Sequence, residues 1–415
     1  MEKCIACIAT FDTKGKEIKY IKDIIEKRGH RTITIDCGVL GTPAFQADIT
    51  REQVAQAAGS TLEQVKATGS AGNAAEIMVP GLIKIVRELC DSGRLAGAIG
   101  IGGGMGIYIG TSAMKTMPLG MPKIMVSPKV GQAGAAAYVG TRDVTIMPSV
   151  ADIEGLNSVI ARVLANAAGA IVGMVEVAEI AEIPKGPIVV MSELGTTTRG
   201  ALMVQGMLEK RGYDVIIFGG MGIGGRCQED LITNEPGIVG VIEFGISEVG
   251  GEIFQASARS GPDRLESAGK RGIPQIVTPG NVDFIAFLGP ETLTERFKTG
   301  HKINYHNPMA TLPMMTAEER SMIAEVVAEK LNRAKGPVRF LLPLRGFSGM
   351  DIKGREYFDP DADRAFAKTL KGKLKPTIPV IEIDAHINDS IFAEKAVEHF
   401  FDQQKEWESQ KKGGK

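Results

Sequence analysis

The chain has little net charge and few aromatic side chains, and both shortages limit what it can bind. Its 415 residues include 48 Lys and Arg against 49 Asp and Glu, and aromatic residues make up 5%. Without an excess of basic residues, no bulk charge attracts nucleic acid or an anionic membrane. Few aromatic rings also argue against a surface on which bases stack. We therefore expect neither nucleic acid nor a membrane as a partner.

Cysteine is scarce, and its positions do not suggest redox chemistry. The five cysteines are too few for a disulfide framework in a chain of this length. Cys4 and Cys7 have the spacing of a redox or metal motif. Positions three apart in an apolar strand point to opposite faces, so buried thiols are the preferred interpretation.

Segments typical of export or membrane insertion are also missing. Glu2 and Lys3 lead directly into an apolar strand pattern, which does not resemble a secretory signal. No uninterrupted apolar stretch reaches the roughly 18 residues that a membrane-spanning helix needs. We expect a cytoplasmic protein.

Signatures of catalysis and metal binding are absent too. There is no zinc motif, no assembled catalytic triad and no pair of carboxylates that can be assigned as acid and base. His301 and His306 lie in a polar stretch, and their spacing is poor evidence for a metal. We predict no metal site.

Glycine, by contrast, is abundant, and it marks a pattern that the chain repeats. Both residues 4–41 and residues 188–224 read as strand, polar turn, helix, strand and glycine-rich turn. Glu26 recurs as Glu209 and Gly41 as Gly224, both at a spacing of 183 positions. This pattern predicts an α/β protein with two tandem Rossmann-like, doubly wound domains, mostly parallel sheets and an internal duplication. Pro184-Lys-Gly-Pro187 marks the boundary, giving domains 1–183 and 184–415.

The expected elements follow the same alternation. We predict strands near 3–9, 31–35, 97–101, 123–127, 143–147, 187–192, 214–218, 238–243, 274–278, 338–342 and 379–384. We predict helices near 15–28, 51–68, 73–92, 151–182, 199–211, 226–232, 263–271, 317–334, 361–371 and 390–409.

The densest glycine signal follows a strand of the first domain. Gly102, Gly103, Gly104 and Gly106 end an apolar strand, and Thr111 and Ser112 follow where a helix begins. Glycine lets backbone N–H groups converge on an anion, and a helix N-terminus adds a favourable dipole. The segment lacks the Gly-Lys-Ser/Thr ending of a Walker motif. Phosphate binding is preferred over the alternative, a tight turn against neighbouring backbone.

A second polar cluster lies after the first strand. Asp12, Thr13 and Lys14 begin a helix, either as a cap with solvated neighbours or as contacts to phosphate, ribose or metal. Arg142 is a further candidate for binding the same anion.

The second domain has its own candidates at strand ends. Gly220, Gly222 and Gly225 have dinucleotide-fingerprint spacing, but they follow the second strand of their domain rather than the first. The remaining candidate cleft residues are Thr197, Thr198, Gly224, Arg226 and Arg345. His386, between Asp384 and Asn388, is a candidate catalytic base together with Asp12, although a hydrogen-bonded structural histidine is the preferred interpretation.

Several strings together resemble a known family. They are Phe11-Asp-Thr-Lys-Gly15, the loop 102–106, Tyr138–Asp143, Asp152–Asn157, Gly224-Gly-Arg226, Ser260–Leu265, His306-Asn-Pro308, Phe340–Gly346 and Asp384–Asp389. The chain resembles, over residues 1–405, the ATP-binding domain family of the tobamovirus-resistance protein. The resemblance implies two Rossmann-like subdomains, a homodimer and binding of ATP or a related nucleotide, which Mg²⁺ would accompany. Departures from the family pattern at 128–134, 219–222 and 243–248 mark a divergent member.

Three functions are compatible with these observations. The first is a protein that binds a nucleotide or another small anionic, phosphate-bearing ligand through glycine-rich loops near an interdomain cleft. The second is an enzyme acting on a small phosphorylated or carboxylated metabolite in that cleft, with Arg142, Arg226 and Arg345 binding the anion. The third is a non-catalytic subunit of a larger assembly, with the Ala- and Gly-rich segment 151–182 as its interface.

Overall fold

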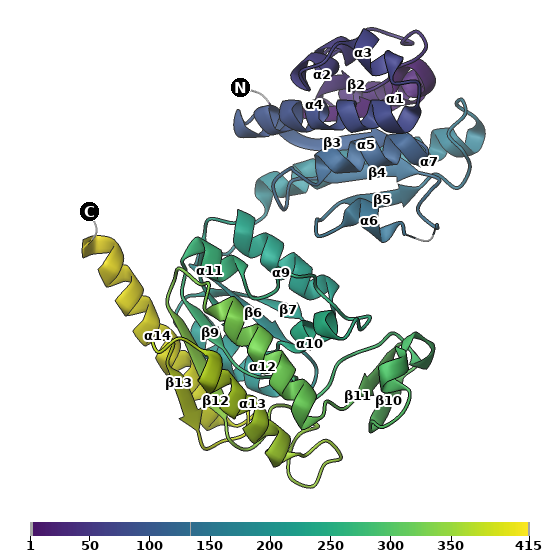
Figure 1. Cartoon of the computed structure of the whole chain (residues 1–415). Coiled ribbons are helices and arrows are strands. Elements are labelled where there is room, and N and C mark those ends of the chain that lie inside the picture. The colour runs from purple at the N-terminus through teal and green to yellow at the C-terminus, as the bar shows by residue number, and fades with distance from the viewer. Residues whose placement is uncertain (1–2, 133, 414–415) are drawn as a thin grey trace. The chain divides into compact units, whose positions relative to one another are not determined.

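The computed structural model contains two compact units, Met1–Ile183 and Pro184–Lys415 (Figure 1). The structure describes residues 3–132 and 134–413. The described residues do not include 1–2, 133 and 414–415. The predicted domain ranges and the segment 128–134 therefore lie partly outside the described residues.

The N-terminal unit is built on a five-stranded parallel sheet with the strand order β2-β1-β3-β4-β5. Its strands are β1 (Cys4–Ala9), β2 (Arg31–Asp36), β3 (Leu95–Ile101), β4 (Lys123–Ser127) and β5 (Thr145–Pro148). Its helices are α1 (Phe11–Lys27), α2 (Arg51–Ala57), α3 (Leu62–Ala67), α4 (Ala71–Asp91), α5 (Gly104–Met114), α6 (Ala136–Val139) and α7 (Ser158–Ile180). The strand order reverses between β1 and β3, which is where ligands bind in open α/β sheets.

Helices cover both faces of this sheet, which explains why its strands are almost continuously apolar. Ile5, Cys7 and Ala9 pack with α1 and α7 on one face. Ala6 and Ile8 pack with α2 to α5 on the other face. Cys7 is buried as expected, whereas Cys4 is half-buried, and none of the five cysteines forms a disulfide.

The C-terminal unit contains a six-stranded sheet of parallel strands and a separate two-stranded antiparallel hairpin. The sheet has the order β13-β12-β9-β8-β6-β7. The strands are β6 (Ile188–Glu193), β7 (Asp214–Gly219), β8 (Ile238–Glu243), β9 (Gln275–Val277), β10 (Ile303–Asn307), β11 (Ala310–Pro313), β12 (Val338–Pro343) and β13 (Val380–Ile383).

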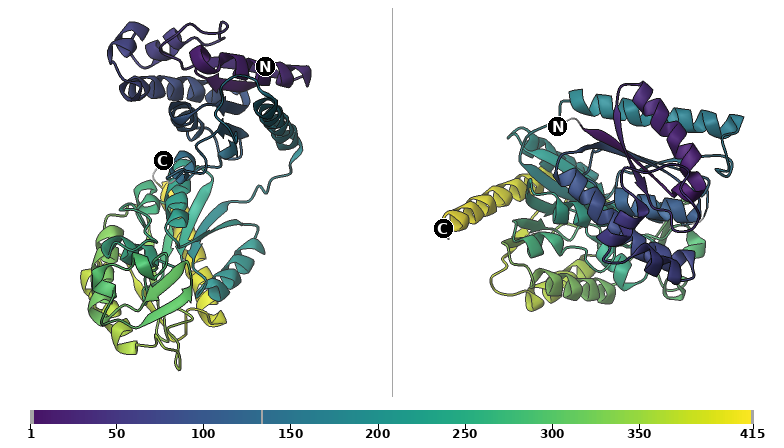
Figure 2. Two further views of the ribbon diagram at one scale, coloured as in Figure 1. Left: turned by 90° about the vertical axis from the view of Figure 1, so that its right-hand side faces the viewer. Right: turned by 90° about the horizontal axis from the view of Figure 1, so that it is seen from above.

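The helices of this unit again cover both faces of the sheet. They are α8 (Thr198–Glu209), α9 (Ile223–Asn234), α10 (Ser247–Ile253), α11 (Ser267–Arg271), α12 (Ala317–Leu331), α13 (Pro360–Lys373) and α14 (Ser390–Gly413). The helices α8 and α14 pack on one face, and α9 to α13 lie on the other. Figure 2 shows the end of α14 extending past the sheet.

The two sheets confirm the predicted α/β fold and support the duplication. Their shared strand order, second-first-third-fourth, is the same. The first strand of each sheet has a register shift at the same position, just before its second residue. After the shift, Ile5 pairs with Gly97, and Val189 pairs with Gly240. By this register, Cys4 of the first unit corresponds to Ile188 of the second, and Arg31 corresponds to Asp214. The spacing between corresponding residues is therefore one residue larger in the first strands than in the second strands. The alignment at a constant spacing of 183 is therefore wrong for the first strand.

Some predicted elements differ from the structure for local reasons. The helix predicted at 51–68 is two helices, because Gly59 adopts a φ of +77° between them. The helix predicted at 151–182 begins only at Ser158, because the Asn157 side chain accepts hydrogen bonds from Val159 N and Ile160 N. The polar stretch around His306 is the hairpin β10–β11 rather than a loop.

Among the described residues, α7 alone is long and apolar enough to cross a membrane by length and composition.

Candidate functional site

A cavity of about 410 Å³ opens at the carboxyl ends of β1, β2 and β3 in the N-terminal unit. It therefore lies at the reversal of strand order described above. The wall is formed by the segments after these strands and by the turn between α3 and α4. The lining residues are Thr10, Asp12, Thr13, Lys14, Cys37, Val39, Leu40, Val65, Lys66, Thr68, Gly69, Ser70, Ala71, Ala74, Ala75, Met78, Gly103, Gly104, Met105, Gly106 and Ile109.

The glycine-rich segment after β3 forms the N-terminus of α5 at this cavity. A Cβ on Gly102 would lie 2.5 Å from the Cα of Gly106, so Gly102 allows the tight turn into the helix. A Cβ on Gly103 or Gly104 would meet nothing within 4 Å. Gly103 is the N-cap and offers no side chain to the first backbone N–H groups of α5. These N–H groups are the donors that an anion at a helix N-terminus uses.

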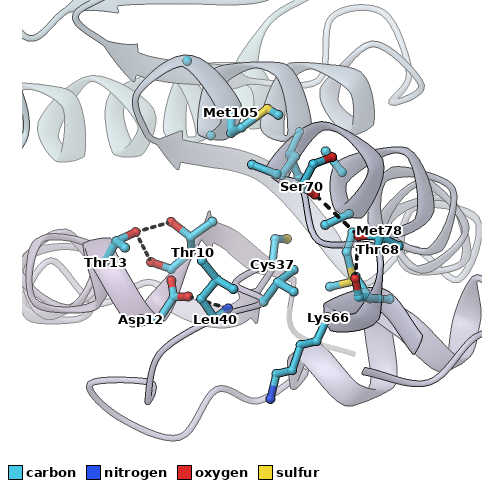
Figure 3. Close-up of a pocket in the computed structure, with 18 of the residues that line it drawn as sticks. Thr10, Asp12, Thr13, Cys37, Leu40, Lys66, Thr68, Ser70, Met78 and Met105 are labelled. Atoms are coloured by element: carbon cyan, nitrogen blue, oxygen red, sulfur yellow. Dashed lines mark hydrogen bonds between the residues drawn. The ribbon is translucent and has the colours of Figure 1, made fainter. Parts of the chain in front are cut away.

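The start of α1 supplies the polar side chains on one side of the cavity (Figure 3). The hydroxyls of Thr10 and Thr13 are hydrogen-bonded to each other at 2.7 Å. Asp12 Oδ2 accepts a hydrogen bond from Leu40 N, whereas the buried Asp12 Oδ1 has no hydrogen-bond partner in the described part of the chain. Lys14 also lines the cavity, but its ammonium is 2.8 Å from Glu154 Oε1.

Two carboxylates converge beside Gly38, next to the cavity. A Cβ on Gly38 would lie 2.8 Å from Asp12 Oδ1 and 3.0 Å from Asp36 Oδ1. Asp36 accepts hydrogen bonds from Phe11 N and Gly38 N, which holds the start of α1 against the end of β2. Burial raises the pKa of Asp36, and the nearby charge of Asp12 acts in the same direction.

The opposite wall was missed by the sequence analysis. Figure 3 shows Lys66, Thr68 and Ser70, from the end of α3 and the turn before α4, across the cavity from Asp12 and Thr13. These residues follow no strand, so the pattern of polar residues at strand ends does not predict them. Ser70 caps α4 by accepting a hydrogen bond from Asn73 N.

The rest of the wall is apolar. Leu40, Val65, Ala74, Met78 and Ile109 contribute aliphatic and thioether surface. Cys37 also lines the cavity, and burial raises the pKa of its thiol, so the sulfur stays protonated and is not a nucleophile at neutral pH. The cavity thus combines an apolar surface with a few polar groups, as small-molecule sites do.

Some predicted residues do not reach this cavity. Gly102, Thr111, Ser112 and Arg142 are not among the residues that line it. The Thr111 hydroxyl is buried and donates to Ile107 O within α5 at 2.6 Å. The predicted residues that do line it are Asp12, Thr13, Lys14, Gly103, Gly104 and Gly106.

In the C-terminal unit, the fingerprint-like glycines face a carboxylate from the same chain. Glu248 Oε1 accepts hydrogen bonds from Gly222 N at 2.5 Å and Gly225 N at 3.2 Å. Glu248 Oε2 lies 2.9 Å from the guanidinium Nε of Arg264. Gly224 serves the turn itself, since a Cβ there would lie 1.9 Å from Gly219 O.

The guanidinium of Arg264 is fully buried and is shared by three glutamates. It contacts Glu229 at 3.2 Å, Glu243 at 2.6 Å and Glu248 at 2.9 Å. Burial raises the pKa of Glu248, which the charge of Arg264 and the backbone N–H groups oppose. The carboxylates raise the pKa of Arg264 against the effect of its burial.

Other predicted residues of this unit have local partners. The Thr197 hydroxyl bonds to the backbone of Leu194, and the Thr198 hydroxyl donates to the carboxylate of Glu193. Arg345 forms an exposed bidentate pair with Asp384, at 2.8 and 2.7 Å. Arg226 is exposed on α9.

The ring nitrogens of His386 both take part in structural hydrogen bonds. Nδ1 accepts from Asn388 N at 3.1 Å, and Nε2 is 2.9 Å from Ser348 O, which requires the tautomer protonated at Nε2. The residue is buried, with 4% of its surface exposed. A general base needs a free nitrogen within reach of substrate, so this arrangement favours the structural interpretation.

No group of three potential metal-ligating residues occurs in the described segments.

Comparisons with known proteins place the whole chain in one family. Residues 3–180 match the N-terminal domain, and residues 186–403 the C-terminal domain, of "Uncharacterised protein family (UPF0261)". The chain belongs to this family. A UPF0261 protein of Clostridium tetani is 38% identical over 394 residues, which cover 95% of this chain and 97% of that protein.

A plant protein is also similar. The ToMV resistance protein Tm-1(GCR237) of Solanum lycopersicum is 32% identical over 338 residues, covering 80% of this chain and 44% of the tomato protein. Among solved structures, UDP-GlcNAc 2-epimerase of Methanocaldococcus jannaschii covers 96% of this chain and 92% of that chain at 10% identity, with a TM-score of 0.20. A match of that quality carries no argument about function.

Proposed function

We propose that the N-terminal unit binds a nucleotide such as ATP, or another phosphate-bearing small molecule, in the cavity at the ends of β1, β2 and β3. The observation that carries the proposal is the uncapped, glycine-built N-terminus of α5 on the wall of a cavity large enough for a small ligand. Cavities of roughly 300–1,000 Å³ are typical of small-molecule sites.

The two ends of a nucleotide match the two kinds of wall. Its phosphates lie at the backbone of Gly103 and Gly104, where the helix dipole and the first N–H groups of α5 favour negative charge. Its base packs on aliphatic surface from residues such as Leu40 and Met78. Asp12, whose Oδ1 has no partner among the described residues, is suited to a ligand hydroxyl or to the Mg²⁺ that accompanies a nucleotide.

The resemblance to the family of the tobamovirus-resistance protein is a second support, because it implies ATP as ligand. A homodimer remains a prediction on the same ground, and a cytoplasmic location remains a prediction from the sequence. Light scattering of the purified chain at low concentration measures the first of these directly.

Replacing Gly104 with valine tests the proposal. A Cβ at this position meets nothing within 4 Å, so the fold accommodates the side chain while its methyl groups obstruct the N-terminus of α5. We expect ATP or ADP, with and without Mg²⁺, to raise the melting temperature of the wild-type protein. In the Gly104→Val variant we expect that rise to be lost, measured by thermal unfolding.

Gly169→Val is the matched control. Gly169 is exposed on α7, a Cβ there also meets nothing within 4 Å, and the residue does not line the cavity. The control should keep the full nucleotide response. A wild-type protein that shows no shift with any nucleotide at millimolar concentration would contradict the proposal.

A further inference from the structure

The internal duplication relates the segments that follow the third strand of each sheet residue by residue. Gly97 and Gly240 hold the same register position on β3 and β8. Counting the same number of residues from each reaches Gly104, the first residue of α5, and Ser247, the first residue of α10. Met105 and Glu248 are therefore equivalent second residues of equivalent helices.

These equivalent residues differ in what they contact. Met105 lines the open cavity of the N-terminal unit. Glu248 is completely buried, and its carboxylate accepts hydrogen bonds from Gly222 N and Gly225 N at the start of α9. Its other oxygen accepts from Arg264 Nε. Converging backbone N–H groups at a helix N-terminus and a guanidinium are the partners that proteins give to a bound phosphate or carboxylate.

The surrounding glycines are explained by the position of this carboxylate. A Cβ on Gly225 would lie 2.1 Å from Glu248 Oε2, so no larger residue fits there while Glu248 is in place. Gly222 adopts a φ of +85°, which turns its N–H toward the carboxylate. The spacing that resembles a dinucleotide fingerprint is thus accounted for by a group within the chain.

We propose that the C-terminal unit contains an anion-binding site of the carboxylate and phosphate class, which the Glu248 side chain occupies as an internal ligand. The site is closed in the native chain, because Glu248 is in place and Glu229 and Glu243 share the same arginine. An anionic ligand from solution would have to displace a carboxylate of the protein and enter beside two more. The C-terminal unit therefore fills this site from within the chain, whereas a cavity lies at the strand ends of the N-terminal unit. The proposal does not rest on nucleotide binding by that unit.

Removal of the internal ligand should open the site to a small anion. The Glu248→Gly variant of the full chain lacks the side chain atoms that propionate can replace. We expect a melting temperature several degrees below that of the wild-type protein. Propionate should restore more than half of the lost melting temperature, and its effect should saturate with concentration. Chloride at equal ionic strength should not have this effect. Inorganic phosphate tests whether a tetrahedral, more highly charged anion is also accepted.

Val249→Gly is the control, because it opens space at the neighbouring buried position of α10 without removing an anion. It should be destabilised and gain no more from propionate than from chloride. If Glu248→Gly does not accumulate as folded protein, the Glu248→Ala variant can be tested with acetate, because the deletion is smaller and acetate replaces the missing atoms. The proposal would be overturned if propionate stabilised the wild-type, Glu248→Gly and Val249→Gly proteins equally. It would also be overturned if propionate failed to stabilise Glu248→Gly and acetate failed to stabilise Glu248→Ala.

Discussion

Replacing Arg264 with methionine is expected to destabilise the C-terminal unit by about 3–5 kcal/mol, the range observed when one partner of a buried ion pair is removed. Methionine keeps an unbranched stem like that of arginine but lacks the guanidinium, so the loss comes mainly from the missing charge and its hydrogen bonds. Glu229, Glu243 and Glu248 would remain buried around a site with no cation. For a domain of this size, the change corresponds to a fall in melting temperature on the order of 10 °C, measured by thermal or urea unfolding.

Arg271→Met provides the comparison for this experiment. Arg271 is half-buried, and within the described part of the chain its guanidinium donates to the backbone carbonyls of Ile232, Glu235 and Pro236. Its loss leaves no buried carboxylate without a cation, so a smaller effect is expected. Equal and small losses in the two variants would show that the three glutamates are not held around Arg264 in solution.

The second large effect is a loss of stability as the pH rises, caused by a second buried cluster of charges. The carboxylates of Asp351 and Asp363 pair with the guanidinium of Arg320. Asp283 accepts a hydrogen bond from the Ser348 hydroxyl and lies close enough for the charges of Asp351 and Arg320 to act on it. Burial, and then the charge of Asp351, raise the pKa of Asp283 to about 7. The same causes raise the pKa of Asp363 to about 9.

The direction of the pH effect follows from proton binding. An unfolded aspartate has a pKa of about 3.9, so above about pH 4 the folded state holds protons that the unfolded state has released. The free energy of unfolding therefore falls as the pH rises toward the folded pKa values and levels off above them. A shift of about three pKa units at one site corresponds to an effect on the order of a few kcal/mol.

Asp283→Asn should remove the contribution of that carboxyl group. The amide oxygen still accepts from Ser348, and no charge develops on the side chain as the pH rises. We expect the melting temperature of the variant to exceed that of the wild-type protein by less at pH 5 than at pH 8. Asp384→Asn, which removes an exposed partner of Arg345, should leave the difference between the two pH values unchanged. A wild-type slope in Asp283→Asn would contradict the assignment.

Much of the fold follows from local patterns. Apolar runs such as 4–9 and 188–191 predict buried parallel strands, and glycines at strand ends predict the turns at the carboxyl edge of the sheet. Where the prediction was wrong, one residue was decisive. Gly59 divides a helix because its positive φ is incompatible with helical backbone, and Asn157 starts α7 by capping it.

The candidate site was only partly predictable. Asp12, Gly103 and Gly104 follow strands, and strands of a parallel sheet end at one edge, so their proximity could be inferred. Lys66, Thr68 and Ser70 follow a helix, and only the packing of α3 and α4 brings them to the cavity. Nothing in local sequence distinguishes their turn from an ordinary solvated connection.

By itself, the sequence determined that this protein consists of two related α/β units with glycine-rich turns at the ends of parallel strands. Hydrophobic periodicity and backbone geometry act over a few residues and can be recognised along the chain. Only the tertiary structure decided which copy is open. Glu248 reaches Gly222 and Gly225 across more than twenty residues, and Arg264 joins it from another segment. Charge neutralisation inside a protein depends on these distances in space, so one unit has an accessible cavity beside its glycine-rich turn, whereas the glycine-rich turn of the other unit binds a buried carboxylate.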